Sequence, residues 1–181
     1  MRITFVRHTE VDVPAGVCYG QTDVPLKPSF PDEAHLVAAN LMRLPSEAGG
    51  YDGVYSSPLS RCTRLASACG YPHAVTDDRL LEMDFGRWEM QRFDEIVDPE
   101  LQRWYDDWFA TPAGGGESMA AQADRVKDFL TDCLSRGKRD ILIFTHAGVI
   151  LCALMLAGKA SLDNIFDHRP PYGGIIRMDF R

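Results

Sequence analysis

The sequence predicts an α/β fold in which a mainly parallel sheet is covered on both faces by helices. Short apolar segments with the composition of strands alternate with longer segments of helical character, an order typical of βαβ units. Three of the strand segments are unusually apolar for their length, as expected for strands buried on both faces. The 181 residues, 45% of them apolar, suffice for one substantial core, so we expect a single domain over residues 1–181.

Five segments are predicted to be strands. The three most apolar are ITFV at 3–6, GVYS at 53–56 and ILIF at 141–144. The segment AVT at 74–76 is shorter, and IIRMDF at 175–180 alternates apolar and polar residues. This alternation is typical of a strand that is only half buried, so we expect 175–180 at an edge of the sheet.

The first two predicted helices lie between the early strands. One covers 32–44 and is ended by Pro45. The next is expected to have Ser57 as its N-cap and Pro58 as its first residue, and to run to about Ala68, because proline is favoured at the first helical position.

Two further helices are predicted in the second half of the chain. Ser118 can cap a helix whose apolar residues recur at helical spacing between 119 and 134. His146 leads into an apolar helix that is closed by Gly158.

Residues 85–112 interrupt the alternation and hold all three tryptophans of the chain. Five apolar residues in this stretch have the spacing of one helix face: Leu101, Trp104, Tyr105, Trp108 and Phe109. The simpler interpretation is that this face packs on the body of the protein. The alternative is an inserted, aromatic-rich helical lid at about 85–117 that covers a substrate pocket.

The composition argues against several classes of protein. A net charge of -7 does not fit a broad nucleic-acid-binding surface. The longest apolar run, at 147–158, is shorter than the ~20 residues that span a membrane, and no secretory signal precedes the first strand. The five cysteines lack CxxC spacing, which indicates neither a disulfide framework nor a zinc site. We therefore expect a soluble, cytoplasmic protein.

Charged side chains follow the predicted strands where these strands end. Arg7 and His8 follow the first strand, Arg61 the second, and His146 the strand ILIF, while Glu82 comes shortly after AVT. Ligands of α/β sheets bind beyond the carboxyl ends of the strands, so these groups are expected to share one edge. So many charges at one edge indicate that an anion binds there.

A phosphate group fits this set of side chains better than a carboxylate. The planar guanidinium of Arg61 can form bidentate hydrogen bonds to phosphate oxygens from the first turn of a helix, whose N-terminus also favours anions. Neighbouring cations disfavour protonation of His8, which leaves its imidazole able to act as a nucleophile. His146 could donate to the equatorial oxygens of the phosphoryl group.

Glu82 is the candidate general acid, which would protonate the departing alcohol and later take a proton from water. We expect a bound phosphate dianion to favour its protonated form. Asp84 and Glu89 are rival acids. Each of these residues alone has an ordinary structural interpretation, and only their joint placement after successive strands indicates a site.

Two other patterns are interpreted as chance. Cys133 and Arg139 have the spacing of a cysteine-dependent phosphatase loop, but that loop needs its cysteine after a strand, and Cys133 lies near the end of a predicted helix. The remaining histidines, His35, His73 and His168, lack the spacing of metal ligands. No metal site is expected.

Four segments, VRHTE, SSPLSRCTRLA, LLEMDFG and FTHAGV, occur in an order that resembles the histidine phosphatase superfamily. The resemblance implies a three-layer α/β/α sandwich of the phosphoglycerate mutase-like type and catalysis without metal or cofactor. It also implies that His8 becomes phosphorylated, that Arg7, Arg61 and His146 form the phosphate pocket, and that Glu82 is the proton donor.

The chain departs from the common family pattern, RHGET followed by asparagine. Thr9 replaces the glycine, Val11 the threonine, and Pro14 stands where the asparagine would fall. The loop that follows must supply substitutes for the missing phosphate contacts, and Tyr19 or the backbone of Gly20 are the candidates.

The stretch RHTEVDVPAGVCYGQTDVPL, the short length and the GGGES segment resemble the α-ribazole phosphatase branch of this superfamily. We therefore expect removal of the 5'-phosphate of α-ribazole 5'-phosphate in cobalamin nucleotide-loop assembly. A broad-specificity or sugar-phosphate phosphatase is the enzymatic alternative, and a non-catalytic phosphate-ligand binding module is the alternative of another class. The expected partner is a small phosphate monoester, with no nucleic acid and no membrane. The sequence does not indicate an oligomeric state.

Overall fold

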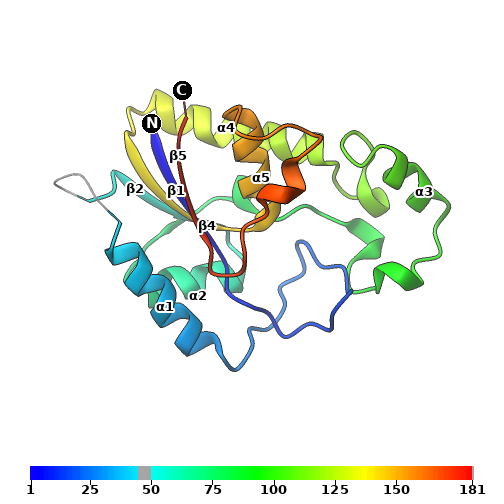
Figure 1. Cartoon of the computed structure of the whole chain (residues 1–181), viewed down its shortest axis with the longest axis horizontal. Coiled ribbons are helices and arrows are strands. Elements are labelled where there is room, and N and C mark those ends of the chain that lie inside the picture. The colour runs from blue at the N-terminus through cyan, green and yellow to red at the C-terminus, as the bar shows by residue number, and fades with distance from the viewer. Residues whose placement is uncertain (45–49, 181) are drawn as a thin grey trace.

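A computed structural model describes residues 1–44 and 50–180 and shows a five-stranded sheet in the order β3-β2-β4-β1-β5 (Figure 1). The strands are β1 (Arg2–Arg7), β2 (Gly53–Ser56), β3 (Val75–Thr76), β4 (Asp140–Thr145) and β5 (Ile175–Asp179). All neighbours pair in parallel except β1 and β5, which are antiparallel. The predicted strands are confirmed, and β5 lies at the edge as expected.

Helices cover both faces of the sheet. Figure 1 shows α1 (Phe30–Met42) and α2 (Ser60–Ala68) on one face, and α4 (Met119–Ser135) and α5 (Ala147–Leu156) on the other. The helix α3 (Pro99–Asp106) lies apart from the sheet, at one end of the molecule. The three-layer α/β/α architecture is therefore confirmed.

Alternate residues of the central strands enter two separate cores. Ile141 and Ile143 of β4 pack with residues of α4 and α5, whereas Leu142 and Phe144 pack with residues of α1 and α2. Side chains of a strand point alternately to its two faces, so a strand that is apolar at every position needs cover on both. This arrangement explains the continuous apolar run in β4.

The start of α2 differs from the sequence prediction. The helix begins at Ser60, with Leu59 rather than Ser57 at its N-cap. The backbone of Ser57 continues the sheet by donating to Phe144 O (2.9 Å), and its hydroxyl lies 2.8 Å from Nε2 of His146. The hydroxyl also accepts from the backbone N–H of Leu59 at 3.4 Å, so Ser57 lies in the turn before the helix rather than at its N-cap.

The other helix predictions have mixed outcomes. The Ser118 cap is confirmed, because its hydroxyl accepts from the backbone N–H of Ala121. The first helix covers Phe30–Met42 rather than 32–44, and its expected terminator Pro45 lies outside the described residues. Cys133 is buried within α4, which agrees with its interpretation as an ordinary core residue.

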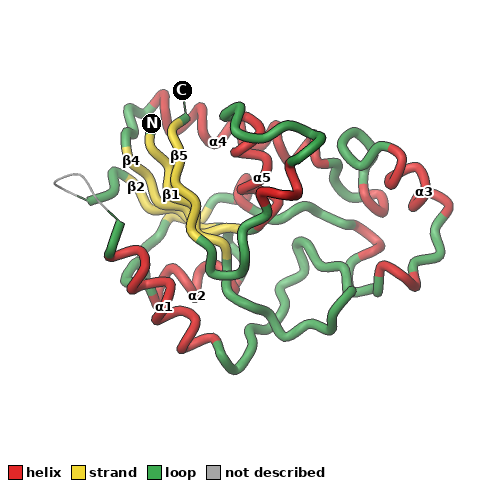
Figure 2. The backbone as a smooth tube through the Cα atoms, in the orientation of Figure 1, coloured by secondary structure: helices red, strands yellow, loops and turns green. Residues whose placement is uncertain are grey.

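The prediction that the apolar residues between 101 and 109 share one helix face is wrong. The helix α3 ends at Asp106, so Trp108 and Phe109 follow it in a turn. The Asp107 carboxylate accepts from the backbone N–H of Ala110 (3.1 Å), and such side chain to backbone bonds compete with helix continuation. Figure 2 shows that much of the chain around α3 is loop. No helix in the described part of the chain is long and apolar enough to cross a membrane.

Candidate active site

The structure brings the predicted charged residues together at the carboxyl ends of the parallel strands. Arg7 ends β1, His8 follows it, and His146 follows β4. The rings of His8 and His146 lie 5.2 Å apart between centroids, and Nε of Arg61 lies 3.3 Å from Nδ1 of His146. These side chains come from distant parts of the chain, and parallel pairing of β1, β2 and β4 places them at one edge.

His8 is oriented so that one ring nitrogen carries a free lone pair. Its Nδ1 lies 2.8 Å from the carbonyl oxygen of Thr9, and only a protonated nitrogen can donate to a carbonyl. Nδ1 therefore holds the proton, and Nε2 keeps its lone pair. Burial, reinforced by the charges of Arg61 and Arg7, lowers the pKa of His8 to about 3. The imidazole is neutral at physiological pH.

His146 has a tautomer fixed by its two partners. Nε of Arg61 donates to Nδ1, so the ring proton resides on Nε2, which lies 2.8 Å from the hydroxyl oxygen of Ser57. Burial, followed by the charge of Arg61, holds the pKa of His146 well below its usual value. The ring is a neutral donor directed through Nε2.

The guanidinium of Arg61 is fully buried and held by a loop. Its Nη1 donates to Thr22 O (2.9 Å) and its Nη2 to Gly20 O (2.5 Å). Glu89 fixes this loop by accepting from the backbone N–H groups of Gln21 (2.8 Å) and Thr22 (2.6 Å). The carbonyl of Gly20 is thus bonded to Arg61, and Gly20 does not line the cavity described below. The sequence instead suggests a contact between the Gly20 backbone and phosphate.

Three N–H groups hold the carboxyl group of Glu82. Oε1 accepts from Gln122 Nε2 and the Met83 backbone, both at 3.0 Å, and Oε2 accepts from the Gly148 backbone at 3.2 Å. A Cβ at Gly148 would lie 2.2 Å from Oε1, so the glycine in FTHAGV leaves room for the acid. The rivals Asp84 and Glu89 do not line the cavity and bond to backbone N–H groups instead.

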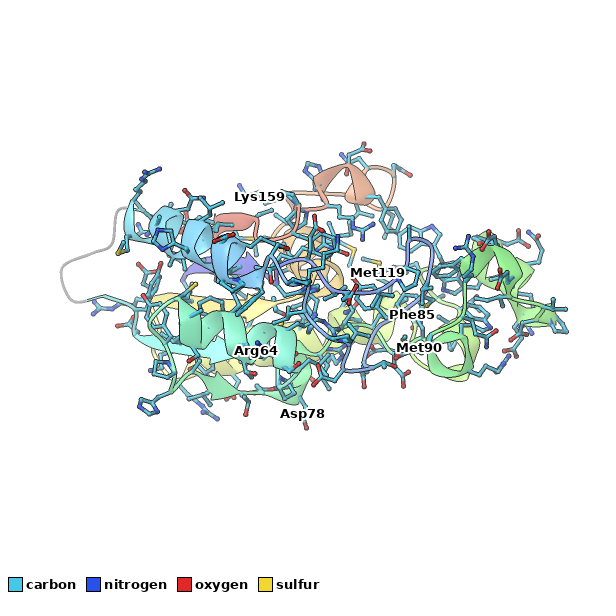
Figure 3. All side chains as sticks on the ribbon, turned by 90° about the horizontal axis from the view of Figure 1, so that it is seen from below. Arg64, Asp78, Phe85, Met90, Met119 and Lys159 are labelled. Atoms are coloured by element: carbon cyan, nitrogen blue, oxygen red, sulfur yellow. The ribbon has the colours of Figure 1, made fainter. Side chains whose placement is uncertain are left out.

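A cavity of about 290 Å³ opens beside these groups. Its polar end is lined by Arg7, His8, Tyr19, Glu82, Arg169 and Tyr172. The rest is largely apolar and includes Phe85, Phe93, Trp104, Trp108, Met119 and Phe166. Figure 3 labels Phe85 and Met119, which line this cavity from the segment 85–117 and from α4. Arg61 and His146 do not line the cavity and are fully buried.

Three residues of this site are not among those predicted from the sequence. Arg169 and Tyr172 line the cavity from the segment before β5, and Gln122 binds Glu82 from α4. The sequence does contain a signal for Gln122, because this polar residue lies on the apolar face of α4. The structure shows that it is buried there. The cluster PPYGG predicts a turn but gives no indication of where that turn lies.

Among residues 1–44 and 50–180, no group of three or more histidine, cysteine, aspartate or glutamate side chains is placed to hold a metal ion.

Stability should fall on mild acidification because of His8. Its pKa is 6.5 in the unfolded state and about 3 in the folded state, so the unfolded chain binds more protons between these values and stability rises with pH in that window. The unfolding free energy of the unsubstituted protein should fall between pH 7 and pH 5. In His8→Asn this fall should be smaller by about 2 kcal/mol. Urea titrations at both pH values measure this, with the exposed His73→Asn as control. Equal pH slopes in His8→Asn and the unsubstituted protein would contradict the assignment.

Residues 3–181 match the model of the Histidine phosphatase superfamily (branch 1). A relative from Hydrogenobacter thermophilus, named "Phosphoserine phosphatase 1", is 29% identical and covers 86% of this chain and 76% of its own length. The crystal structure of a phosphoglycerate mutase from Thermus thermophilus superposes with a TM-score of 0.77 at 27% identity, over 99% of this chain and 94% of that one.

A second solved structure, a proposed alpha-ribazole-5'-P phosphatase from Escherichia coli, superposes with a TM-score of 0.82. The match covers 98% of this chain and 89% of that chain at 24% identity. These likenesses show that the chain has the phosphoglycerate mutase-like fold.

Proposed function

The chain belongs to the histidine phosphatase superfamily, and from that premise we propose that it is a phosphomonoesterase that works through a phosphohistidine at His8 and acts on α-ribazole 5'-phosphate. Phosphatase or mutase chemistry is the established activity of the family. The observation that carries the proposal is the neutral His8, whose Nε2 lone pair is free at the polar end of the cavity.

The first step transfers the phosphoryl group to His8. Nε2 attacks phosphorus, the bond between phosphorus and the ester oxygen breaks, and Glu82 gives its proton to the departing alkoxide. Arg7 and Arg61 flank His8, and their charges offset the negative charge of the equatorial oxygens. His146 does not line the cavity and directs its N–H to the Ser57 hydroxyl, so its part in the proposed chemistry is to hold Arg61 in place through Nδ1.

The second step hydrolyses the phosphohistidine. Water attacks phosphorus, Glu82 takes a proton from that water, and the bond between phosphorus and Nε2 breaks with its electron pair returning to the ring. Inorganic phosphate leaves, and both His8 and Glu82 regain their starting protonation states. Glu82 lines the same cavity as His8, which gives it access to both the alcohol and the water.

The apolar end of the cavity supports a substrate whose alcohol carries a planar aromatic group. Phe85, Phe93, Trp104 and Trp108 come from the proposed lid at about 85–117, and all four line the cavity. The rings of Phe93 and Trp104 are stacked at 6.1 Å. A benzimidazole base, as in α-ribazole 5'-phosphate, can stack against such rings.

A carboxylate-bearing phosphate monoester is the second candidate substrate. Arg169 is exposed, lines the cavity and has no salt bridge in the described part of the chain, so it could bind a carboxylate. The relative named phosphoserine phosphatase and the structure named phosphoglycerate mutase fit such substrates.

A substrate comparison tests the proposal. Hydrolysis of p-nitrophenyl phosphate in EDTA distinguishes an enzyme from a non-catalytic binding module. The kcat/KM for α-ribazole 5'-phosphate is then compared with the values for phosphoserine, 3-phosphoglycerate and ribose 5-phosphate. The protein could hydrolyse p-nitrophenyl phosphate while its kcat/KM for α-ribazole 5'-phosphate ranks below the values for the other esters. That result would support the phosphatase activity and reject α-ribazole 5'-phosphate as the substrate.

Trp104→Ala should impair recognition of an aromatic alcohol specifically. Loss of one stacking ring is expected to raise the KM for α-ribazole 5'-phosphate by about tenfold, with little change for ribose 5-phosphate, which has no aromatic group. Steady-state kinetics on both substrates measure the difference. Tyr105→Ala is the matched control, because Tyr105 is exposed and does not line the cavity. An equal rise of KM for both substrates would show that Trp104 only supports the fold.

A further inference from the structure

Tyr172 lies at the polar end of the cavity without a role in the chemistry described so far. Its ring is stacked on the Arg7 guanidinium at 3.9 Å and lies 5.5 Å from the ring of His8. Its hydroxyl is 2.7 Å from the hydroxyl of Tyr19, and the ring of Tyr19 lies 5.5 Å from the Arg61 guanidinium. The two tyrosines therefore cover both arginines and the nucleophile.

The backbone of a tight turn fixes Tyr172 in this place. Gly173 N–H donates to His8 O (3.0 Å), and Arg7 N–H donates to Gly174 O (2.9 Å). Gly173 has a φ of +66°, a conformation that glycine adopts without strain. The turn that carries Tyr172 is thus hydrogen-bonded to the backbone of Arg7 and His8 through Gly173 and Gly174.

Two polar atoms of the residues next to His8 have no hydrogen-bond partner in the described part of the chain. Nε of Arg7 and Oγ1 of Thr9 are buried, and neither has a hydrogen-bond partner in the described part of the chain. Buried polar groups without partners are costly and occur where a ligand completes the bonding. His8 is itself only 2% exposed, and both tyrosines line the same cavity, so a phosphate bound there lies within reach of their hydroxyls.

We propose that Tyr172, together with Tyr19, binds the phosphate group of the substrate, with the bond between the two hydroxyls replaced by one bond from each hydroxyl to a phosphate oxygen. This inference rests on the proposed phosphatase function. Tyr19 belongs to the loop that follows His8, where the sequence departs from the common family pattern at Val11 and Pro14. Burial raises the pKa of Tyr19, so its hydroxyl keeps the proton that it donates.

Phenylalanine variants test the two hydroxyls while retaining the rings. Tyr172→Phe and Tyr19→Phe should each weaken binding of inorganic phosphate, measured by isothermal titration calorimetry, by about tenfold, because each loses a hydrogen bond to a charged group. The double variant should lose about a hundredfold, and kcat/KM for p-nitrophenyl phosphate should fall in parallel. Tyr71→Phe is the matched control, because Tyr71 packs in the other core, against Phe144.

The outcomes separate this inference from the proposed function. If the unsubstituted protein binds phosphate and hydrolyses the ester while the double variant binds phosphate equally or more tightly, the tyrosines only close the site, and the inference fails while the function stands. If the unsubstituted protein neither binds phosphate nor hydrolyses the ester, both fail.

Discussion

Replacement of His8 by alanine is expected to lower kcat for p-nitrophenyl phosphate by about 10³-fold or more, because the covalent route is lost with its nucleophile. Nε2 of His8 is the nitrogen with a free lone pair at the cavity. His146, the other histidine of the site, directs its Nε2 toward Ser57 and does not line the cavity. We therefore expect no replacement nucleophile. Steady-state kinetics in EDTA provide the measurement.

Two controls make this result specific. His168→Ala removes an exposed histidine and should leave kcat unchanged. Rapid mixing with ³²P-labelled ester followed by alkaline quenching should trap labelled protein in the unsubstituted enzyme and none in His8→Ala. A His8→Ala protein that keeps more than about a tenth of its kcat would exclude His8 as the nucleophile.

The second large effect is expected for Glu82→Gln, and it should depend on the leaving group. An alkoxide needs a proton to depart, so kcat for an alkyl phosphate should fall by about 10²- to 10⁴-fold. The p-nitrophenolate ion departs without a proton, so kcat for its ester should fall far less. The amide oxygen of the introduced glutamine can still accept from Gln122 or Gly148, which donate to the Glu82 carboxyl group in the unsubstituted protein.

Kinetics with both esters between pH 5 and pH 8 measure this contrast. Asp84→Asn is the control, because Asp84 is the nearby rival acid and its carboxylate bonds to the Gly86 backbone. Turnover of the alkyl phosphate that is unaffected by Glu82→Gln at every pH would remove Glu82 from the role of general acid.

The strands and the position of the site could be predicted from the sequence because both depend on local patterns. A run such as ILIF at 141–144 is apolar at every position only if both faces of its strand are covered, and the two cores confirm that cover. The charged residues that end such runs then had to share one edge of a parallel sheet. Arg7, His8, Arg61 and His146 were found in this way.

Other features depend on tertiary contacts that no local pattern contains. Ser57 has a good N-cap sequence, but its hydroxyl lies against His146, a residue 89 positions away. Tyr172 reaches Arg7 only because β5 pairs beside β1. The end of α3 depends on the local turn at Asp107, which competes with a helical spacing that the sequence satisfies equally well.

The order of the strands also determines when the segment that carries His8 can be completed during folding. β1 is the first strand along the chain, yet its two neighbours are β4 and β5, the last two. The pair Arg2–Asp140 closes a separation of 138 residues, and contacts between such distant residues form slowly. Until they form, β1 presents two unpaired edges and apolar side chains at Ile3, Phe5 and Val6, which favours pairing with the wrong strand. The segment on which the proposed chemistry depends is therefore open to misassembly until the rest of the chain is present.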